Sequence, residues 1–565
     1  MALEGRALVH RFKKIFVLLT VLLTSALALV GCAGVPSSGS VQTGLSNLKQ
    51  TDEQVVFDPS GPLPGATQEE VLRGFLVAAS SANHDYAVAR EYLTPAFADV
   101  WEPRAIALID EGTRPFQQIS ETSASVSIST IAQVDRNGIL TVNPTQSQTS
   151  ELNFEFERVG NEWRISRAPV GIVLDRSMFT TVWMQISLYY PDSTGTLFAD
   201  QRWFVNDTLL MQRVLEQLLA GPSAMHQLAY SPAIPNSVAL QSPPLIDDGR
   251  INVELSSAFA ELSDTAIDTF AAQLNATLAP LGVLDHYTIS TASNRSVREG
   301  WVATKQEEEL SKFPYALRNN SFGELRGSLI EGQTALAEPL QKLKPLDAMV
   351  NIAGDRAAVL TTKGVHLVQG DSETLVDARK DLLNPSLDPW GYVWTAAPGS
   401  SSQIFVQNGE GAPTEFQVPA VELDGLQQIR VSADGNLLAM LVTRNSQTSV
   451  LVSGISRDAH GAPNGLDPAA HLVLTQTGNA VDIDWIDGSR FVVLSRVSEA
   501  AKVTVGGVGL LPTDRGVVPN GISVAAADSS RGLRVLDTDG TVLRPQGANG
   551  WTQAASEIAL LAKRI

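Results

Sequence analysis

A single cysteine, Cys32, is the residue with the clearest chemical potential in this sequence of 565 residues. One cysteine excludes an intramolecular disulfide, a zinc site with several cysteine ligands and an iron–sulfur cluster, because each of these needs at least two thiols. A thiol at this position can still take a diacylglyceryl group. The residues that precede it decide whether that chemistry is expected.

The first 31 residues have the features of an export signal. Ile15–Val30 is an uncharged run of 16 residues, which is short for a membrane-spanning helix of about 20 residues and suits the apolar region of a signal peptide. Leu29, Val30 and the small residue Gly31 lead directly into Cys32. The basic residues before the run are Arg6, Arg11, Lys13 and Lys14.

This order of basic region, apolar run, small residue and cysteine resembles the lipobox of bacterial lipoproteins. We therefore predict a signal peptide at 1–31, a lipid anchor with acyl chains such as palmitate on Cys32, and a lipidated N-terminus with a flexible tether at 32–66. The alternative is an uncleaved membrane anchor with a chance cysteine. Both interpretations place the remainder outside the cytoplasm, at the cell membrane.

The charge of the chain argues against nucleic acid as a partner. Acidic residues outnumber basic ones by 60 to 41, and the net charge is −19. Removal of residues 1–31 takes away four basic residues and one acidic residue, which leaves −22. A chain this acidic, without an evident basic stripe, is repelled by a phosphate backbone. The apolar fraction of 44% excludes wholesale disorder.

Other reactive residue types do not form a recognisable catalytic or metal-binding motif. The seven histidines lack the spacing of a zinc motif, and no G-x-S-x-G nucleophile elbow or phosphate-binding loop occurs. Gly506–Gly509 is glycine-rich but has no following Lys-Ser/Thr. We expect no enzyme activity, no metal and no cofactor.

The exported chain begins with a predicted α+β domain at 67–178. Thr67 and Glu70 fit a capping box at the start of a helix. Apolar residues then repeat at helical spacing, and alternating strands follow. Two helices before a curved antiparallel sheet resemble the cystatin- or NTF2-like layout.

A second α+β domain is predicted at 179–306. Its expected order is β-α-β-β-α-β, with both helices on one sheet. Thr208 is the predicted cap of a leucine-rich helix that ends at Gly221-Pro222, Val238–Gln241 is a predicted strand, and Ser263 or Asp264 starts the second helix. The stretch Val214–Ser223 with Ile251–Ser256 and Phe270–Leu274 resembles the GerM-type (GerMN) domain.

The remainder, 320–565, is rich in short strands and turns. A turn containing aspartate recurs beside apolar strands at loose intervals, which is typical of β-propeller blades. Five to seven blades of about 40 residues fit this length, and the aspartates are expected to make turn hydrogen bonds. These aspartates are Asp355, Asp388, Asp434 and Asp487.

Three aromatic residues of this segment are candidates for partner binding. Trp390, Tyr392 and Trp394 alternate, so they face one side if the segment is an extended strand. Exposed, they could form a hot spot for a partner or a glycan. The alternative is that they belong to the propeller core.

The order of lipobox, α+β domain, GerMN-type domain and propeller resembles the LpqB family of actinobacterial lipoproteins. The resemblance implies an accessory protein of a two-component system, which contacts the extracytoplasmic sensor domain of an MtrB-type histidine kinase and affects cell-envelope homeostasis and division. It implies no catalytic residues. Two alternatives stay open: an envelope glycan-binding or glycan-processing protein, and a passive envelope scaffold.

Overall fold

A computed structural model describes most of the chain after residue 57. The described residues are 58–143, 149–247, 250–282, 287–291, 296–299, 313–319, 321–332, 334–398, 403–409, 411–417, 425–527 and 529–565. The predicted signal peptide, Leu29, Val30, Gly31 and Cys32 lie outside them. Residues 58–565 form one compact unit. None of the helices in the described part has the length and apolar character needed to cross a membrane.

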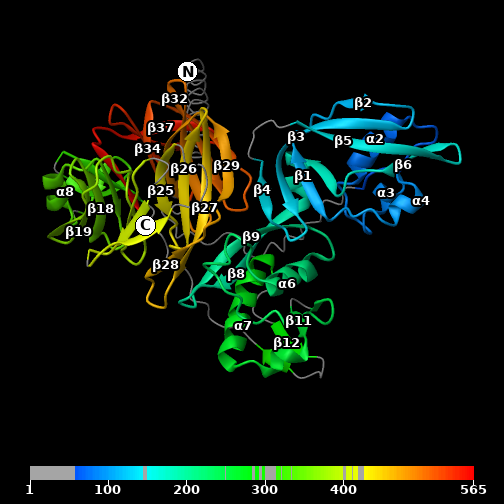
Figure 1. Cartoon of the computed structure of the whole chain (residues 1–565), viewed down its shortest axis with the longest axis horizontal. Helices are drawn as coiled ribbons and strands as arrows, with labels where there is room; N and C mark the ends of the chain where they lie inside the picture. Colours follow the sequence, from blue (N-terminus) through cyan, green and yellow to red (C-terminus); the bar gives the residue numbers. More distant parts are fainter. Residues whose placement is uncertain are drawn as a thin grey trace, which may run out of the picture. The chain divides into compact units, whose positions relative to one another are not determined.

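The N-terminal domain packs helices on a curved sheet (Figure 1). Thr67 caps α2 (Gln68–Ala78) with the predicted capping box. The main path of the sheet runs β6-β5-β3-β1-β7, with β1 and β7 parallel. Phe75 of α2 lies 5.2 Å from Trp101 and 6.4 Å from Phe154, ring centre to ring centre. The remaining elements are α3 (Ala87–Arg90), α4 (Pro95–Ala98), β1 (Ile106–Asp110), β2 (Phe116–Gln118), β3 (Ser123–Asp135), β4 (Leu140–Val142), β5 (Thr149–Val159), β6 (Glu162–Arg167) and β7 (Ile172–Asp175).

The middle domain combines a long hairpin with a separate four-stranded sheet around a shared core. The hairpin joins β8 (Trp183–Pro191) and β9 (Leu197–Val205). The sheet has the order β10-β11-β12-β13. The single sheet expected from the sequence is therefore divided in two, and β9 is a strand that the sequence analysis missed. The other elements are α5 (Arg176–Val182), α6 (Leu210–Ala220), β10 (Leu245–Asp247), β11 (Arg250–Leu255), η1 (Ser257–Glu261), α7 (Asp264–Leu278), η2 (Ala279–Leu281), β12 (Tyr287–Thr291) and β13 (Ser296–Glu299).

Two of the three predictions for the helix ends of this domain are confirmed, and one is wrong. Gly221 ends α6 with a φ of 95°, which favours glycine, and Ser263 caps α7. The prediction for Thr208 is wrong, because α6 has no side-chain cap. Its neighbour Asp207 accepts a hydrogen bond from the amide of Leu209 instead, at 2.9 Å.

The predicted strand Val238–Gln241 is also not formed. Leu240 makes only an isolated bridge to Leu255 of β11. The segment still donates the amide of Gln241 to the carbonyl of Glu254 at 2.9 Å and the amide of Ala239 to Ser256 Oγ at 3.2 Å. It lies beside the sheet without extending it.

In the described part of 313–565 the strands form six blades, and the first strands contact one another in a closed ring. Five blades follow chain order: β17–β20, β21–β24, β25–β29, β30–β33 and β34–β37. The sixth joins both ends of the segment, because the C-terminal strand β38 pairs with β14 and also runs parallel to β17. β14 begins at Tyr315, ahead of the start at 320 that the sequence suggested.

The elements of the propeller are as follows: β14 (Tyr315–Arg318), β15 (Ser321–Arg326), β16 (Leu329–Glu331), α8 (Ala337–Leu343), β17 (Asp347–Val350), β18 (Arg356–Thr361), β19 (Gly364–Gln369), β20 (Ser372–Asp377), β21 (Ser386–Leu387), β22 (Val393–Thr395), β23 (Gln403–Gln407), β24 (Thr414–Gln417), β25 (Leu426–Val431), β26 (Leu437–Arg444), β27 (Gln447–Arg457), β28 (Pro463–Leu466), β29 (His471–Thr477), β30 (Asn479–Trp485), β31 (Arg490–Val497), β32 (Ala500–Gly507), β33 (Thr513–Pro519), β34 (Gly521–Ala525), β35 (Arg534–Asp537), β36 (Val542–Gln546), β37 (Gly550–Ala555) and β38 (Leu560–Arg564).

The recurring aspartates make turn hydrogen bonds in three of the four predicted places. Asp388 accepts from the amides of Trp390 and Tyr392. Asp434 and Asp487 accept from the amides two residues further on. Asp355 is the exception. The side chain of Asn351 accepts from the turn amides there, and those amides belong to Asp355 and Arg356. The repeat therefore reflects the connection between the first and second strands of these blades.

Buried charges on the innermost strands surround the propeller axis. Lys563 of β38 lies 2.9 Å from Asp482 of β30, and Arg430 of β25 lies 3.2 Å from Asp347 of β17. Asp484 forms no salt bridge with a described residue but accepts from the amide of Ala526 at 2.7 Å. Burial raises the pKa of Asp484 to about 7, against the opposing effect of Lys563. This network ties the first blade to the last.

Candidate functional site

The three aromatic residues proposed from the sequence do not share one face of a strand. Trp390 and Tyr392 lie in the turn before β22, and only Trp394 lies in the strand. Trp394 is fully buried, and its indole donates to Asp388 at 3.0 Å. The extended conformation assumed for the alternation is therefore wrong, because the Asp388 turn bends the chain here. Trp394 belongs to the propeller core.

Trp390 and Tyr392 remain half-buried. Tyr392 packs against the hydrophobic core of this part of the propeller, and Trp390 lies against a buried cation. The guanidinium of Arg457 lies 4.1 Å from the ring centre of Trp390. Arg457 is itself paired with Asp388 at 2.9 Å, and both side chains are buried. The exposed parts of Trp390 and Tyr392 are thus presented by a rigid turn.

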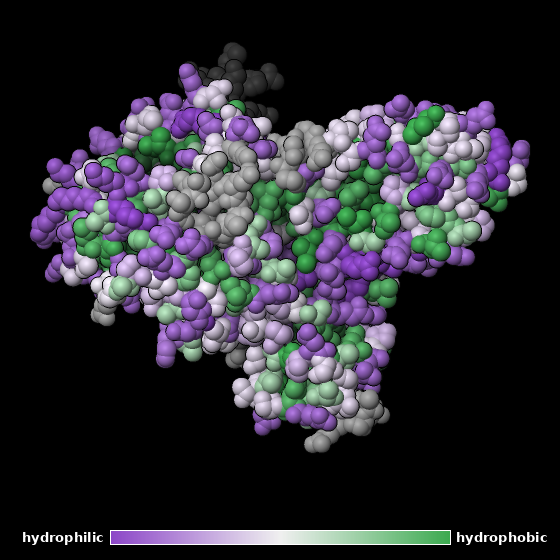
Figure 2. Space-filling model, in the orientation of Figure 1, coloured by the Kyte–Doolittle hydropathy of each residue, from purple (hydrophilic) through white to green (hydrophobic). Residues whose placement is uncertain are grey.

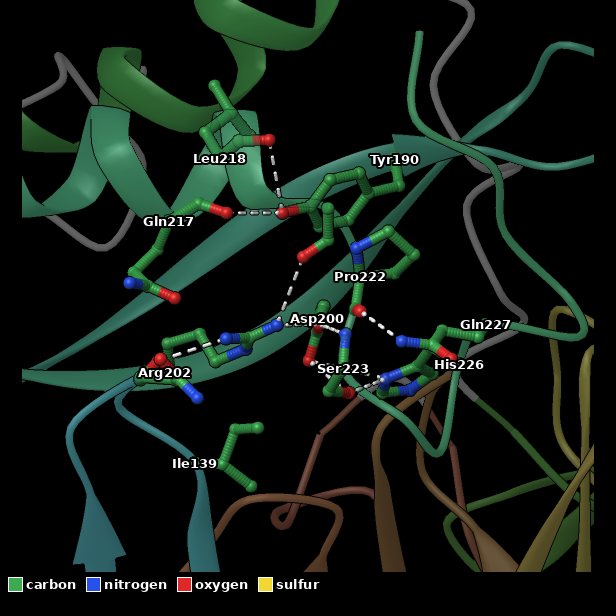
Figure 3. A network of polar contacts seen from close by, with 12 residues as sticks. Ile139, Tyr190, Asp200, Arg202, Gln217, Leu218, Pro222, Ser223, His226 and Gln227 are labelled. Atoms are coloured by element: carbon green, nitrogen blue, oxygen red, sulfur yellow. Dashed lines mark hydrogen bonds and ion pairs between the residues drawn. The ribbon is translucent and has the colours of Figure 1, made fainter. Parts of the chain in front are cut away.

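A buried polar cluster in the middle domain, comprising Asp200, Arg202, Ser223 and His226, is shown in Figure 3. Asp200 and Arg202 lie two residues apart on β9, so both side chains point to one side of the hairpin. Asp200 pairs with Arg202 at 2.8 Å and accepts from the amide of Ser223 at 2.7 Å. His226 is only 1% exposed, and its ring stacks on Tyr230.

Although this cluster contains serine, histidine and aspartate, it does not have the geometry of a catalytic triad. Ser223 Oγ lies 2.9 Å from Nδ1 of His226, and Asp200 lies 3.2 Å from the same nitrogen. A triad needs the serine and the carboxylate on opposite ring nitrogens. All three side chains are also buried, so a substrate has no access.

The charges of the cluster stabilise one another. Burial alone would raise the pKa of Asp200, but His226 and Arg202 hold the pKa well below its usual range. Asp200 in turn raises the pKa of Arg202, against the effect of burial. Tyr190 has a raised pKa because it is buried, and its hydroxyl donates to the carbonyl of Gln217 at 3.0 Å. Asp200 therefore stays ionised and Arg202 stays charged in the folded protein.

Strand β9, which carries Asp200 and Arg202, also joins the middle domain to the N-terminal domain. Arg202 donates to the carbonyl of Asn137 at 2.9 Å, and the amide of Trp203 donates to the carbonyl of Gly138 at 2.8 Å. Gly138 has a φ of 79°, and a Cβ there would lie 2.7 Å from the carbonyl oxygen of Trp203. Only glycine suits this close approach.

Three further hydrogen bonds join the middle domain to the propeller. Trp203 donates from its indole to the carbonyl of Gly509 at 2.8 Å. Tyr230 donates to Asp434 at 3.2 Å, and Ser193 donates to the carbonyl of Asp458 at 3.2 Å. We call this set of contacts around Arg202, Trp203 and Tyr230 the junction. The junction connects all three domains.

A cavity of about 1260 Å³ lies beside the junction. Its lining comes from all three domains and combines apolar with charged residues of both signs. The charged ones are Glu111, Asp175, Arg176, Asp487, Arg490, Asp514 and Arg515. Hydrophobic residues on the visible face of the molecule occur as separate patches among hydrophilic ones (Figure 2). No group of three or more histidine, cysteine or carboxylate side chains suited to a metal occurs in the described part of the chain.

The sequence analysis missed this cluster for a clear reason. Asp200 and His226 are separated by 26 positions, and no motif links them. The one available signal is the alternation of Asp200 and Arg202, but it requires knowledge of β9. Local histidine spacing does not reveal a cluster of this kind, because its members meet only in the tertiary structure.

Three family profiles match the chain in sequence order. The profile "Lipoprotein LpqB, N-terminal domain" matches residues 61–180. "Sporulation and spore germination" matches 187–292, and "Lipoprotein LpqB beta-propeller domain" matches 332–559. These spans follow the three domains described above.

Two curated relatives are similar along nearly the whole chain, and a third is similar along half of it. "Lipoprotein LpqB" of Cutibacterium acnes is 24% identical over 592 residues, which cover 96% of this chain and 98% of the relative. "Lipoprotein LpqB" of Streptomyces avermitilis is 25% identical, with 94% and 95% covered. The one from Nocardia farcinica is 28% identical over 50% of this chain and 49% of its own.

Solved structures are similar to parts of the chain only. TolB from Acinetobacter baumannii gives a TM-score of 0.30 at 11% identity and covers 51% of this chain and 86% of its own. The tandem GerMN domains of the sporulation protein GerM from Bacillus subtilis give a TM-score of 0.18 at 16% identity, with 22% and 46% covered. The architecture given above rests on the strand pairing within this chain.

Proposed function

The chain belongs to the LpqB family of lipoproteins, and from this premise we propose that it is anchored through Cys32 on the extracytoplasmic face of the membrane. There it binds the sensor domain of an MtrB-type two-component histidine kinase and modulates its signalling, which affects cell-envelope homeostasis and division. It acts by binding and not by catalysis.

The junction is the observation that supports this proposal most directly. It connects the three domains through buried or partly buried hydrogen bonds. The one serine–histidine–aspartate cluster within it lacks the geometry for catalysis. A rigid body of several domains is suited to recognising one conformation of a partner and to biasing its equilibrium by the difference in affinity.

The predicted tether also supports the proposal, because it keeps the three folded domains near other proteins of the same membrane. Twenty-five residues separate Cys32 from Asp58, the first described residue. A flexible tether of this length, as the sequence predicts, has a typical span of roughly 25–30 Å and a limit of about 90 Å. A partner in the same membrane then meets a high effective concentration, so a weak contact suffices.

The direct test is affinity capture from membranes with the native protein and with Cys32→Ala. We expect the kinase to be captured with the lipidated protein and to be strongly reduced with Cys32→Ala. Mass spectrometry of the native protein checks the acylation itself. A bare thiol, or capture that never includes a sensor kinase, would contradict the proposal.

A second measurement locates the contact surface. The mature lipoprotein in nanodiscs is titrated with the purified kinase sensor domain. We expect Tyr392→Ala to weaken binding at least fivefold, because its half-buried ring is on the Asp388 turn. Trp163→Ala, in the N-terminal domain, is the matched control and should bind like the native protein. Equal effects of both substitutions would exclude the Asp388 turn as the contact surface.

A further inference from the structure

Arg534, on β35 of the last complete blade, is a buried cation that has no counter-ion among the described residues. Its side chain is 8% exposed. One terminal nitrogen donates to two backbone carbonyls, of Leu533 at 2.8 Å and of Arg531 at 3.4 Å. Nε has no partner. No carboxylate among the described residues forms an ion pair with it.

Other buried arginines in this protein are neutralised. Arg202 pairs with Asp200 at 2.8 Å, Arg430 with Asp347 at 3.2 Å and Arg457 with Asp388 at 2.9 Å. This pattern is expected, because a buried charge without a partner is strongly destabilising. Arg534 departs from the pattern of its own protein.

A second guanidinium adds to the uncompensated charge. The pairing of Val535 with Leu543 places Arg534 directly opposite Arg544 of β36. Residues opposite each other in an antiparallel pair share a face, and like charges there repel. Burial, and then the charge of Arg544, lower the pKa of Arg534. Arg544 itself is exposed, so a ligand from solvent can reach it.

A third guanidinium borders the same loop. Arg515 of β33 donates to Ser530 Oγ at 3.1 Å, and its Nε is also buried without a partner. Ser530 lies in the turn Ser529–Gly532, and Arg534 donates to Arg531 in that same turn. Arg515 and Ser530 also line the cavity of about 1260 Å³, which gives an anion a route to the turn.

We propose that Arg515, Arg534 and Arg544, with Ser530, form a binding site for a phosphate group, carried by a phosphate monoester or diester. One guanidinium group can donate two parallel hydrogen bonds to two oxygens of the same phosphate. A tetrahedral phosphate can accept from several guanidiniums around it at once, whereas a carboxylate has only two oxygens. In a chain with a net charge of −19, three neighbouring arginines that form no ion pair with a described carboxylate are a local exception that attracts an anion.

The test is calorimetric titration of the full mature lipoprotein, in neutral detergent at low ionic strength, with inorganic phosphate. We expect saturable binding that weakens as salt is added. Arg534→Gln should weaken it at least tenfold, and Arg544→Gln at least threefold. Arg544 is exposed, so Arg544→Gln should fold even if Arg534→Gln does not. Phosphate binding by Arg544→Gln then tests the proposal.

Arg356→Gln is the matched control. Arg356 also has a buried Nε without a partner and donates to a backbone carbonyl, of Asn408. It lies opposite Gln369 and not opposite a second arginine. Phosphate binding should be unchanged in this variant. Absence of saturable binding to the native protein, or equal loss in all three variants, would overturn the proposal.

Two further measurements identify the compound that carries the phosphate and test whether Asp528 is the counter-ion of Arg534. Titration with glycerophosphoglycerol, the soluble headgroup of phosphatidylglycerol, is compared with inorganic phosphate. Tighter binding of the diester supports a lipid headgroup, and tighter binding of phosphate supports a soluble monoester. Asp528 lies in the same connection but outside the described residues. If phosphate binds to Asp528→Asn and not to the native protein, Asp528 is the counter-ion and the site does not exist.

Discussion

Asp484 is the residue whose buried environment has the most direct consequence for pH dependence. It is fully buried, and burial raises the pKa of its carboxyl to about 7. In the unfolded chain the pKa is near 4. Between these values the folded state keeps a proton that the unfolded state has lost. The contribution of Asp484 to the stability of the folded protein therefore decreases as the pH rises from about 4 to 7.

Asp484→Asn removes this loss, since asparagine stays neutral and its amide oxygen can still accept from Ala526. We expect the variant to match the native protein near pH 4 and to be more stable by roughly 2–4 kcal/mol near pH 8. Urea unfolding curves at several pH values measure the difference. A variant that is less stable by a constant amount at every pH would show that the carboxyl is ionised in the folded state.

At the level of elements, local signals were reliable where they act within a few residues. The capping box of Thr67 and Glu70 formed as predicted, because both partners lie in one turn. The aspartate turns marked four of the six blades. The blade closed by β38 carried no such signal, because its strands come from opposite ends of the segment.

Tertiary context explains the elements that were predicted wrongly. β9 has a mixed pattern because its polar residues Asp200 and Arg202 are buried at the junction, so it lacks a solvated face. Thr208 has the right side chain for a cap, but Asp207 occupies the position that reaches the amide. Trp390 and Trp394 alternate in sequence without sharing a strand. None of these outcomes can be read from spacing alone.

Ring closure by β38 leads to a prediction for this element. Lys563 pairs with Asp482 at 2.9 Å inside the ring, and Asp347 lies 3.8 Å away. Lys563→Met leaves these carboxylates buried with one cation fewer, so we expect a loss of about 3–5 kcal/mol in the free energy of unfolding. Thermal unfolding followed by circular dichroism measures it.

The control for this variant is Lys342→Met. Lys342 pairs with Glu338 on α8, where both side chains are largely exposed. An exposed pair of this kind contributes little, so the melting temperature should barely change. Equal shifts in both variants would mean that the buried network is not what closes the ring.

On the scale of the whole molecule, the junction determines whether the three domains behave as one body. Its hydrogen bonds link residues as far apart in sequence as Trp203 and Gly509. No local sequence pattern therefore predicts the junction. The domain order could be predicted because each domain has its own pattern. The contacts between domains could not, because they depend on single side chains that meet only in the folded chain.

Removal of two junction hydrogen bonds should uncouple the domains without unfolding any of them. In the double variant Trp203→Phe and Tyr230→Phe, the aromatic rings remain in their packed positions, but the bonds to Gly509 and Asp434 are lost. Each bond contributes about 1 kcal/mol. We expect circular dichroism to stay native, a single unfolding transition to split into two, and kinase-sensor affinity to decrease because the partner no longer meets a fixed surface. Tyr189→Phe, which keeps every junction bond, is the control. If the double variant still unfolds in one transition and binds the sensor domain as the native protein does, then the rigidity supplied by the junction is not what the partner recognises.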